Sequence, residues 1–403
     1  MTSEERHELR YQRRKAKRDA KKKRMTVEMD FKKVFTTGNM YEAFKKCTKG
    51  VRWKSSTQKY IDNAILQNYK TKKSLLDGTF RSDGFYEFDL FERGKARHIM
   101  SVTMRERVVQ RCLCDYSLVP VVARTFIYDN AASLKDKGYH FAIRRMVCHL
   151  QRHYRKHGNE GYVLLFDFSK FFDNVSHHVV QTILRKQYED KWLLGLIMHF
   201  VRSFGDVGMG LGSQISQTLA VASANPLDHW IKEKQRIKGY ARYMDDGYLI
   251  HEDKKYLQKC LDEIIKICDI LQIKLNLKKT HIVKLSHGFS WLKCRFYLLK
   301  TGQVVRKIYK RSVTKMRQKI KAFKRLYSKG IMNLTQIRDG FQSWMSYALN
   351  FDTVGTVISM IDLLKEQFGM DDMKNIVQVK KLKHTRNRKK MRYVQYYVQH
   401  MAA

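Results

Sequence analysis

Apolar segments that end in acidic residues mark the middle of the chain. Residues 161–166 form an apolar run that stops at Asp167, and this pattern is typical of a buried strand. Strand-forming residues at 239–242 and 247–250 flank a short tip, Tyr-Met-Asp-Asp, at 243–246. Because polar residues between two strand-like segments indicate a turn, we predict a hairpin that carries two adjacent carboxylates at its tip.

The remaining hydrophobic pattern predicts helices and a further strand pair. Residues 84–110 begin with a segment of alternating polarity, followed by a turn and a second strand-like segment. This pattern indicates two strands followed by a helix. Apolar residues at helical spacing predict helices over most of 25–80, over 256–268 and over 301–370. In the first of these regions we assign five large side chains to the core: Trp53, Tyr60, Ile61, Ile65 and Leu66. Together the elements indicate an α+β fold.

The acidic residues suggest metal chemistry only when they are taken together. An Asp-Asp pair such as Asp245 and Asp246 is by itself more often part of a solvated loop. With Asp167 at the end of a neighbouring strand, three carboxylates could hold two divalent ions, which offsets the cost of burying like charges. Two ions about 4 Å apart can activate a 3′ hydroxyl and stabilise a leaving pyrophosphate. We therefore expect two Mg²⁺ ions, with Mn²⁺ as a substitute.

Length and charge narrow the class of protein. A chain of 403 residues exceeds one compact core of the usual size, so two or three subdomains are expected. Eighty Lys and Arg against 38 Asp and Glu give a net charge of +42, which suits a polyanion such as RNA, with an acidic membrane surface as the alternative. No apolar run of about 18 residues and no signal-peptide pattern is present, so we expect neither a membrane-spanning nor a secreted protein, and we favour the nucleic-acid partner over a membrane. Seven scattered cysteines without a Cys-x-x-Cys pair favour a reducing cytoplasm and no zinc site.

Two of these motifs together resemble a known family. The segment Phe-Asp-Phe-Ser-Lys-Phe-Phe-Asp-Asn at 166–174, followed by the tip at 243–246, resembles the palm of bacterial reverse transcriptases, over roughly residues 85–345. The similar enzymes are those of group II introns, diversity-generating retroelements and the unknown-group, defence-associated branch. The resemblance implies a right-hand polymerase, with an antiparallel palm sheet that carries the hairpin. It divides the chain into a basic N-terminal arm (1–24), fingers with an N-terminal helical region (25–160), palm (161–300), helical thumb (301–370) and basic C-terminal tail (371–403).

The resemblance also assigns roles at the catalytic centre. It implies that Asp167, Asp245 and Asp246 are catalytic and bind metal, with Phe168 beside them in the metal site. Lys279 corresponds to the basic residue that can protonate the leaving pyrophosphate, although a lysine here could equally be an ordinary surface residue.

Other matching positions would bind the incoming nucleotide. Lys95 and Arg97 lie in the hairpin that closes over the triphosphate in this family, where cations neutralise phosphate charge. Phe172 falls where the family carries an aromatic steric gate against the 2′ hydroxyl; the alternative is an ordinary core aromatic. The next residues, Asp173 and Asn174, are expected to cap the following helix.

The glycine-rich segment at 207–217 indicates the branch of the family. Leu211, Gly212 and Gln217 would line the nucleotide site, and glycines permit close approach of a ligand. Intron enzymes carry Gln before the motif glycine and Ser-Pro at its end, whereas this chain has Leu211 and Gln217. That variant resembles the retroelement and unknown-group enzymes, in which an apolar residue at this position accompanies low fidelity. Low fidelity is therefore a hypothesis for this chain.

A last group of residues would contact primer and template. Arg144 and Arg145 belong to a basic helix expected on the template backbone. Tyr243 and Met244 would lie beside the primer end, and Trp291 lies in a hairpin that resembles the primer support.

The sequence thus predicts an RNA-directed DNA polymerase whose partners are an RNA template, dNTPs and the DNA product. An RNA polymerase with a similar palm and a non-catalytic RNA-binding factor are the alternatives. We expect a stand-alone enzyme of antiphage defence that copies an associated non-coding RNA. A diversity-generating element with error-prone cDNA synthesis, or template-independent DNA synthesis, is the alternative role. The sequence leaves oligomerisation open.

Overall fold

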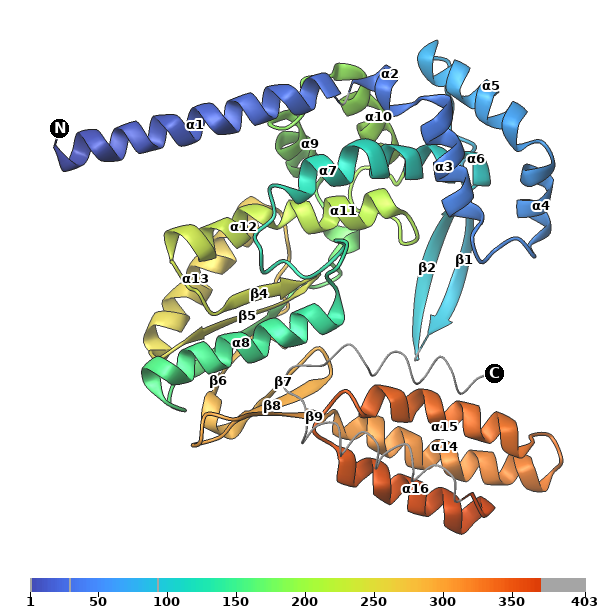
Figure 1. The fold of residues 1–403 in the computed structure, drawn as a ribbon, viewed down its shortest axis with the longest axis vertical. Coiled ribbons are helices and arrows are strands. Elements are labelled where there is room, and N and C mark those ends of the chain that lie inside the picture. The colour runs from blue at the N-terminus through green and yellow to red at the C-terminus, as the bar shows by residue number, and fades with distance from the viewer. Residues whose placement is uncertain (1, 29, 93, 371–403) are drawn as a thin grey trace. The chain divides into compact units, whose positions relative to one another are not determined.

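A computed structural model describes residues 2–28, 30–92 and 94–370 of the chain, which divides into two compact units (Figure 1). The first unit contains residues 1–153 and 161–282, and the second contains residues 154–160 and 283–403. The basic tail predicted at 371–403 lies outside the described residues. Among the helices that the structure describes, none combines the length and the apolar character needed to cross a bilayer.

The first unit opens with helices and a long hairpin. Its first elements are α1 (Ser3–Glu28), α2 (Phe31–Val34), α3 (Thr37–Thr48), α4 (Ser55–Asp62), α5 (Ala64–Leu76), β1 (Phe85–Glu92) and β2 (Lys95–Val102). They are followed by α6 (Met104–Leu113), a π-helical turn (Cys114–Leu118), α7 (Val119–Ala123) and α8 (Tyr139–His157). Strands β1 and β2 pair antiparallel along their whole length, which confirms the strand pair predicted at 84–110.

The rest of this unit surrounds a four-stranded sheet. Its strands are β3 (Tyr162–Asp167), β4 (Tyr240–Tyr243), β5 (Asp246–His251) and β6 (His281–Lys284), in the order β4-β5-β3-β6. Its helices are α9 (His177–Arg185), α10 (Lys191–Arg202), α11 (Gln214–Ser223), α12 (Asn225–His229) and α13 (Lys254–Ile270), with a 3-10 turn at Phe172–Asn174 and a π turn at Trp230–Lys234; a further 3-10 turn, Leu285–His287, belongs to the second unit. Strand β5 runs antiparallel to both β3 and β4, and α13 packs on β3 and β5. The predicted antiparallel sheet with the 243–246 tip is confirmed.

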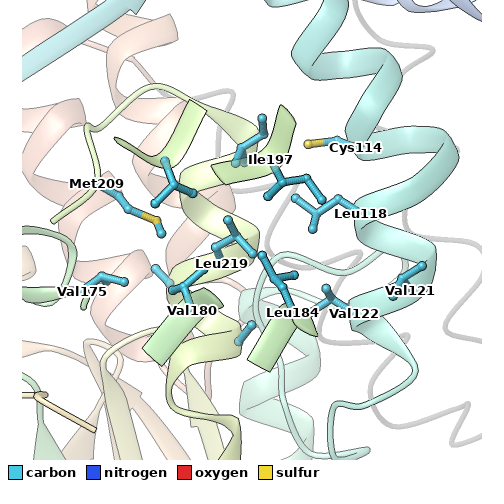
Figure 2. Close-up of a cluster of buried hydrophobic side chains, with 14 of the residues drawn as sticks. Cys114, Leu118, Val121, Val122, Val175, Val180, Leu184, Ile197, Met209 and Leu219 are labelled. Atoms are coloured by element: carbon cyan, nitrogen blue, oxygen red, sulfur yellow. The ribbon is translucent and has the colours of Figure 1, made fainter. Parts of the chain in front are cut away.

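An apolar cluster fixes the helices beside the sheet (Figure 2). Leu184 of α9, Ile197 of α10 and Leu219 of α11 are fully or almost fully buried, and they meet Leu118 from the π turn before α7. Burying each such side chain contributes about 1.5–3 kcal/mol relative to leaving it in water. Helix α11, which follows the glycine-rich segment, is therefore held in place by its apolar contacts.

The core assignment in the N-terminal helices is partly wrong. Trp53, Ile65 and Leu66 are 75%, 78% and 50% exposed, whereas Tyr60 and Ile61 pack against the core. Helix α5 instead turns a mixed face inward, made of Ala64, Asn68, Thr71 and Leu75. Helical spacing alone does not show which of two faces is buried, and here Asn68 on the buried face accepts a hydrogen bond from the hydroxyl of Tyr60 (2.7 Å).

The second unit joins a small sheet to a helical bundle. Its three-stranded sheet has the order β7 (Phe289–Trp291), β8 (Cys294–Leu298), β9 (Val304–Ile308), and the helices are α14 (Lys310–Ser328), α15 (Leu334–Ala348) and α16 (Val354–Phe368). The three helices contact one another, and α14 buries Met316, Ile320 and Phe323 while most of its basic residues stay exposed. The helices expected after residue 300 are therefore present.

Candidate active site

The fold brings the three acidic residues singled out by the sequence to one end of the sheet. Asp167 is the last residue of β3 and lies opposite Asp246, the first residue of β5. Asp245 precedes it in the turn, and its carbonyl oxygen accepts a hydrogen bond from the backbone N–H of Phe168 (3.2 Å). Strand pairing therefore places the carboxylate-bearing residues of two distant motifs side by side.

Burial and mutual repulsion raise the pKa of two of these carboxyl groups. Burial raises the pKa of Asp245, and the charge of Asp167 adds to the effect. Burial also raises the pKa of Asp246 to about 7, with further contributions from the charges of Asp245 and Asp167. Burial and neighbouring negative charges destabilise the ionised form of these carboxyl groups, and a nearby cation would stabilise it.

Lys279 supplies a cation to this site. Its ammonium nitrogen lies 3.0 Å and 2.9 Å from Oδ1 and Oδ2 of Asp167, and the amide of Asn276 donates to Oδ1 as well (3.1 Å). The hydrogen bond to Asp167 raises the pKa of Lys279, so the lysine stays charged. Asp167 is almost fully buried while Lys279 is 59% exposed, which leaves the ammonium group room to move away.

The site fits an ion that takes part of its shell from a substrate. In the part of the chain that the structure describes, no three His, Cys, Asp or Glu side chains converge tightly enough to enclose an ion. Mg²⁺ commonly uses only one or two carboxylates together with substrate phosphates. The Lys279 contact shows that a positive charge is accommodated at Asp167.

The hairpin that carries Asp245 and Asp246 has a constrained backbone. Met244 has φ 55°, a left-handed conformation that is uncommon for a residue with a side chain. One residue after the acidic pair, a Cβ at Gly247 would collide with the ring of Phe166 across the strands, so only glycine fits there. Tyr243 and Met244 are half-buried at this tip, and their predicted contact with the primer end stays a prediction.

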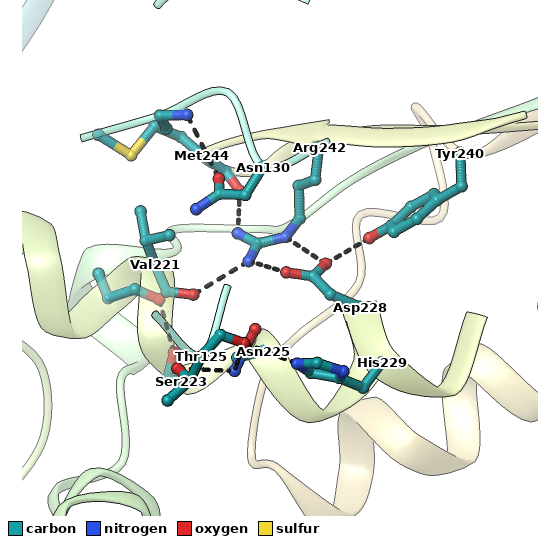
Figure 3. Close-up of polar contacts among 12 residues, drawn as sticks. Thr125, Asn130, Val221, Ser223, Asn225, Asp228, His229, Tyr240, Arg242 and Met244 are labelled. Atoms are coloured by element: carbon teal, nitrogen blue, oxygen red, sulfur yellow. Dashed lines mark hydrogen bonds and ion pairs between the residues drawn. The ribbon is translucent and has the colours of Figure 1, made fainter. Parts of the chain in front are cut away.

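A buried arginine supports the tip and was not identified as functional from the sequence (Figure 3). Arg242 has no exposed side-chain surface, and its guanidinium binds both carboxylate oxygens of Asp228 at 2.8 Å and 2.6 Å. It also donates to the carbonyl oxygens of Met244 (2.7 Å) and Val221 (3.0 Å). The sequence feature that could have identified Arg242 is its position as a charged residue between the apolar and aromatic residues of a predicted strand.

A second ion cluster involves one of the two predicted template contacts. Asp129 forms ion pairs with Arg145 and with Lys232 (2.7 Å), and His149 lies 3.5 Å from its carboxylate. Arg145 is therefore largely occupied inside the protein, whereas its neighbour Arg144 is exposed on α8. The contact of both residues with a template stays a prediction.

The glycine-rich segment lies between the loop after β3 and the hairpin of β1 and β2. The half-buried Phe172 accepts a hydrogen bond at its carbonyl from the N–H of Met209 (2.9 Å). Leu211 then pairs with Ile99 of β2 through a parallel bridge. Gly212 has φ +115°, which favours glycine, and Gln217 is exposed on α11. Phe172 and the glycine-rich segment, two of the motifs predicted to bind the nucleotide, are thus in backbone contact, and the glycine-rich segment also pairs with β2, the strand that carries Lys95 and Arg97.

Three further predictions concern the hairpin cations, Trp291 and the helix cap after Phe172. Arg97 is exposed on β2, whereas the side chain of Lys95 lies outside the described part of the structure. Trp291 is buried on β7 of the second unit. The expected helix cap at 173–174 is wrong, because these residues form a 3-10 turn and Ser176 caps α9 instead.

Comparison with known proteins identifies the family. The family profile described as reverse transcriptase (RNA-dependent DNA polymerase) matches residues 91–296, just over half of the chain. The chain belongs to the reverse transcriptase family. This confirms the predicted family and enzyme class, whereas the narrower bacterial branch stays a prediction.

The relatives of this reverse transcriptase are distant. Protein YkfC of Escherichia coli (strain K12) is 23% identical over 242 residues, which cover 49% of this chain and 62% of the relative. The structure of Candida albicans telomerase in complex with a TWJ fragment of telomeric RNA is similar with a TM-score of 0.43 and 12% identity, covering 69% of this chain and 55% of the telomerase chain. Apo telomerase of Candida tropicalis, truncated from the C-terminal domain, gives a TM-score of 0.42 and 11% identity, covering 60% of each chain.

Proposed function

We propose that this reverse transcriptase copies an RNA template into DNA at the site formed by Asp167, Asp245 and Asp246. The observation that carries the proposal is the register of β3 and β5, which sets Asp167 opposite Asp246 at the end of the sheet. These carboxylates, with Phe168 beside them, would hold two Mg²⁺ ions. Bound divalent ions supply activation of the attacking 3′ hydroxyl and neutralisation of the developing phosphate charge.

The chain's own residues supply the other parts of the reaction. Lys279, whose ammonium group contacts Asp167, would supply the proton that the leaving pyrophosphate takes up, and Asp167 would be the carboxylate that it gives up to a bound metal ion. The ring of Phe172 excludes a 2′ hydroxyl and selects dNTPs. Arg97 and Lys95 neutralise the triphosphate from the hairpin of β1 and β2.

The net charge supports nucleic-acid partners, and the glycine-rich segment bears on the biological role of the enzyme. A net charge of +42 favours long contacts with the phosphates of an RNA template and the DNA product. We place the enzyme in antiphage defence, where it copies an associated non-coding RNA. The apolar residue Leu211 in the glycine-rich segment supports the alternative of error-prone cDNA synthesis in a diversity-generating element.

A primed homopolymer assay tests the reaction. With poly(rA) and oligo(dT), we expect the wild-type protein to incorporate dTTP in preference to UTP. Asp167→Asn and Asp245→Asn should each lower the rate about 1,000-fold, because the metal sites lose a charged ligand. The matched control Asp262→Asn, at an exposed position on α13, should retain full activity. Preference for UTP would indicate an RNA polymerase, and RNA binding without incorporation would indicate a non-catalytic factor.

A further inference from the structure

We infer that Arg242, paired with Asp228, is a positioning residue that fixes the direction of Asp245 and couples the hairpin tip to helix α11. The inference rests on the proposed function for the meaning of the tip, and on the hydrogen bonds of the buried guanidinium for its mechanism (Figure 3).

The guanidinium of Arg242 makes four specific hydrogen bonds. Two go to the carboxylate of Asp228 on α12, and the other two go to the backbone carbonyls of Met244 and Val221. The pair has no exposed side-chain surface on either partner. Although burial alone would lower it, the carboxylate of Asp228 raises the pKa of Arg242 above its usual value, so the arginine remains charged. A planar fork with several fixed donors suits such multiple contacts, and a lysine could not reproduce them.

The contact with Met244 acts directly on the catalytic tip. The carbonyl of Met244 and the N–H of Asp245 belong to the same planar peptide group. Holding this carbonyl at 2.7 Å therefore sets the plane from which the Asp245 side chain departs. Met244 also adopts a left-handed backbone (φ 55°), a conformation that persists only where the surroundings hold it.

The remaining contacts connect the tip to the nucleotide side of the site. Val221 belongs to α11, the helix that begins at Gln214 directly after the glycine-rich segment. The backbone of Arg242 also pairs with a neighbouring loop, because its N–H donates to the backbone carbonyl of Asp129 (3.3 Å) and its own carbonyl accepts from the N–H of Ala131 (3.0 Å). Arg242 therefore bonds α11, α12 and the hairpin tip at the same time and fixes their positions relative to one another.

Variants of the Arg242–Asp228 pair distinguish a role in positioning Asp245 from a role in protein stability alone. Arg242→Met alone leaves the Asp228 carboxylate buried without its partner, and such a variant is expected to unfold easily. The double variant Arg242→Met/Asp228→Asn removes both charges, and the new amide oxygen still accepts from the hydroxyl of Tyr240. Lys232→Met is the matched control, because it removes another largely buried cation, whose ion pair is with the carboxylate of Asp129, whereas Arg242 bonds only the backbone of that loop.

Three measurements on these proteins decide the matter: thermal unfolding, kcat and KM for dTTP on primed poly(rA), and Mn²⁺ binding by electron paramagnetic resonance. We expect the double variant to be folded and about as stable as Lys232→Met, yet to lose kcat about 100-fold, the effect of misplacing a reacting group by about 1 Å. Its KM should change little, and its Mn²⁺ affinity should fall. Lys232→Met should keep kcat. Compared with Arg242→Met, the variant Arg242→Lys should regain more of the wild-type stability than of the wild-type kcat.

If the double variant regains both the stability and the kcat of the wild type, the inference is overturned and Arg242 has a structural role only. If the double variant does not fold, the Arg242→Lys protein decides in the same way, since equal recovery of kcat and stability would again contradict positioning. If the wild-type protein incorporates no dNTP, the proposed function fails. The comparison of Mn²⁺ affinity between wild type and the Arg242 variants then still tests the positioning.

Discussion

The ammonium group of Lys279 lies 2.9 Å from Oδ2 of Asp167 and 3.0 Å from Oδ1, so it contacts the carboxylate that the proposed mechanism assigns to a metal ion. Two cations cannot share this carboxylate closely without repelling each other. Lys279 and a divalent ion should therefore compete for Asp167, and the lysine becomes available as a proton donor only after it is displaced.

Replacing Lys279 by Met should change metal binding and catalysis in opposite directions. Mn²⁺ should bind more tightly, because the competing ammonium group is gone. The polymerisation rate should fall by roughly 100-fold or more, because a general acid is lost. Without metal the stability should fall by no more than about 1 kcal/mol, since the lysine is largely exposed. Lys278→Met, at the exposed neighbouring position, is the control. Weaker Mn²⁺ binding in Lys279→Met would contradict competition.

Phe172 should control the choice of sugar. Its half-buried ring lies in the turn that follows Asp167, and its carbonyl is held by Met209. Phe172→Val should raise the relative use of rNTPs by roughly 10–100-fold, because excluding a hydroxyl by volume alone supplies discrimination of that size. The ratio of kcat/KM for UTP and dTTP measures the effect, with the core variant Phe171→Leu as control. An unchanged ratio would identify Phe172 as an ordinary packing residue.

Leu211 should affect fidelity. It lies half-buried where the glycine-rich segment pairs with Ile99. If an apolar side chain here loosens base selection, Leu211→Gln should lower misincorporation several-fold on a defined template, while Leu211→Met should leave it unchanged. Sequencing of cDNA copied by each variant measures this. A Leu211→Gln enzyme that copies no more faithfully than wild type would count against the hypothesis.

The ion cluster around Asp129 should make the protein sensitive to acid. Burial opposes ionisation of Asp129, but the hydrogen bond from His149 and the charge of Lys232 outweigh it and hold the pKa of Asp129 well below its usual range. Arg145 adds a further contact to the carboxylate. Because an unfolded aspartate titrates near about pH 4, the stability from this group is present above that pH and is lost as the pH falls below it.

His149 contributes in the same direction at higher pH. Burial lowers the pKa of His149, so the unfolded imidazole takes up its proton first, near about pH 6.5, and stability falls as the pH drops below that value. Asp129→Asn should be destabilised at pH 7 but lose less stability than wild type between pH 5 and pH 3. Urea unfolding at several pH values measures both effects, and identical acid slopes for the two proteins would contradict the assignment.

The part of the site that is local in sequence was predictable. The apolar run before Asp167 and the tip at 243–246 each have a pattern of their own, and the structure has the strand and the hairpin at those places. The motifs also imply that Asp167 and the tip lie together, and the register of β3 and β5 fulfils this.

Contacts between separate segments were not predictable in the same way. Arg242 is a strand residue and Asp228 a helix residue, and no local pattern indicates that they bind each other. The pairing of Leu211 with Ile99 likewise depends on how the fold brings two distant segments together. Ile65 was misassigned because helical spacing does not reveal which face of α5 is buried, and that face carries Ala64, Asn68, Thr71 and Leu75.

The most direct test of the central claim uses protein purified together with its bound RNA. Incorporation of labelled dNTPs is measured for the wild type and for Asp245→Ala/Asp246→Ala, before and after treatment with RNase. The account predicts DNA made by the wild type only, with synthesis abolished by RNase, and the sequence of that DNA identifies the template. Synthesis that survives RNase, or equal activity of the two proteins, would contradict RNA-templated polymerisation at these carboxylates.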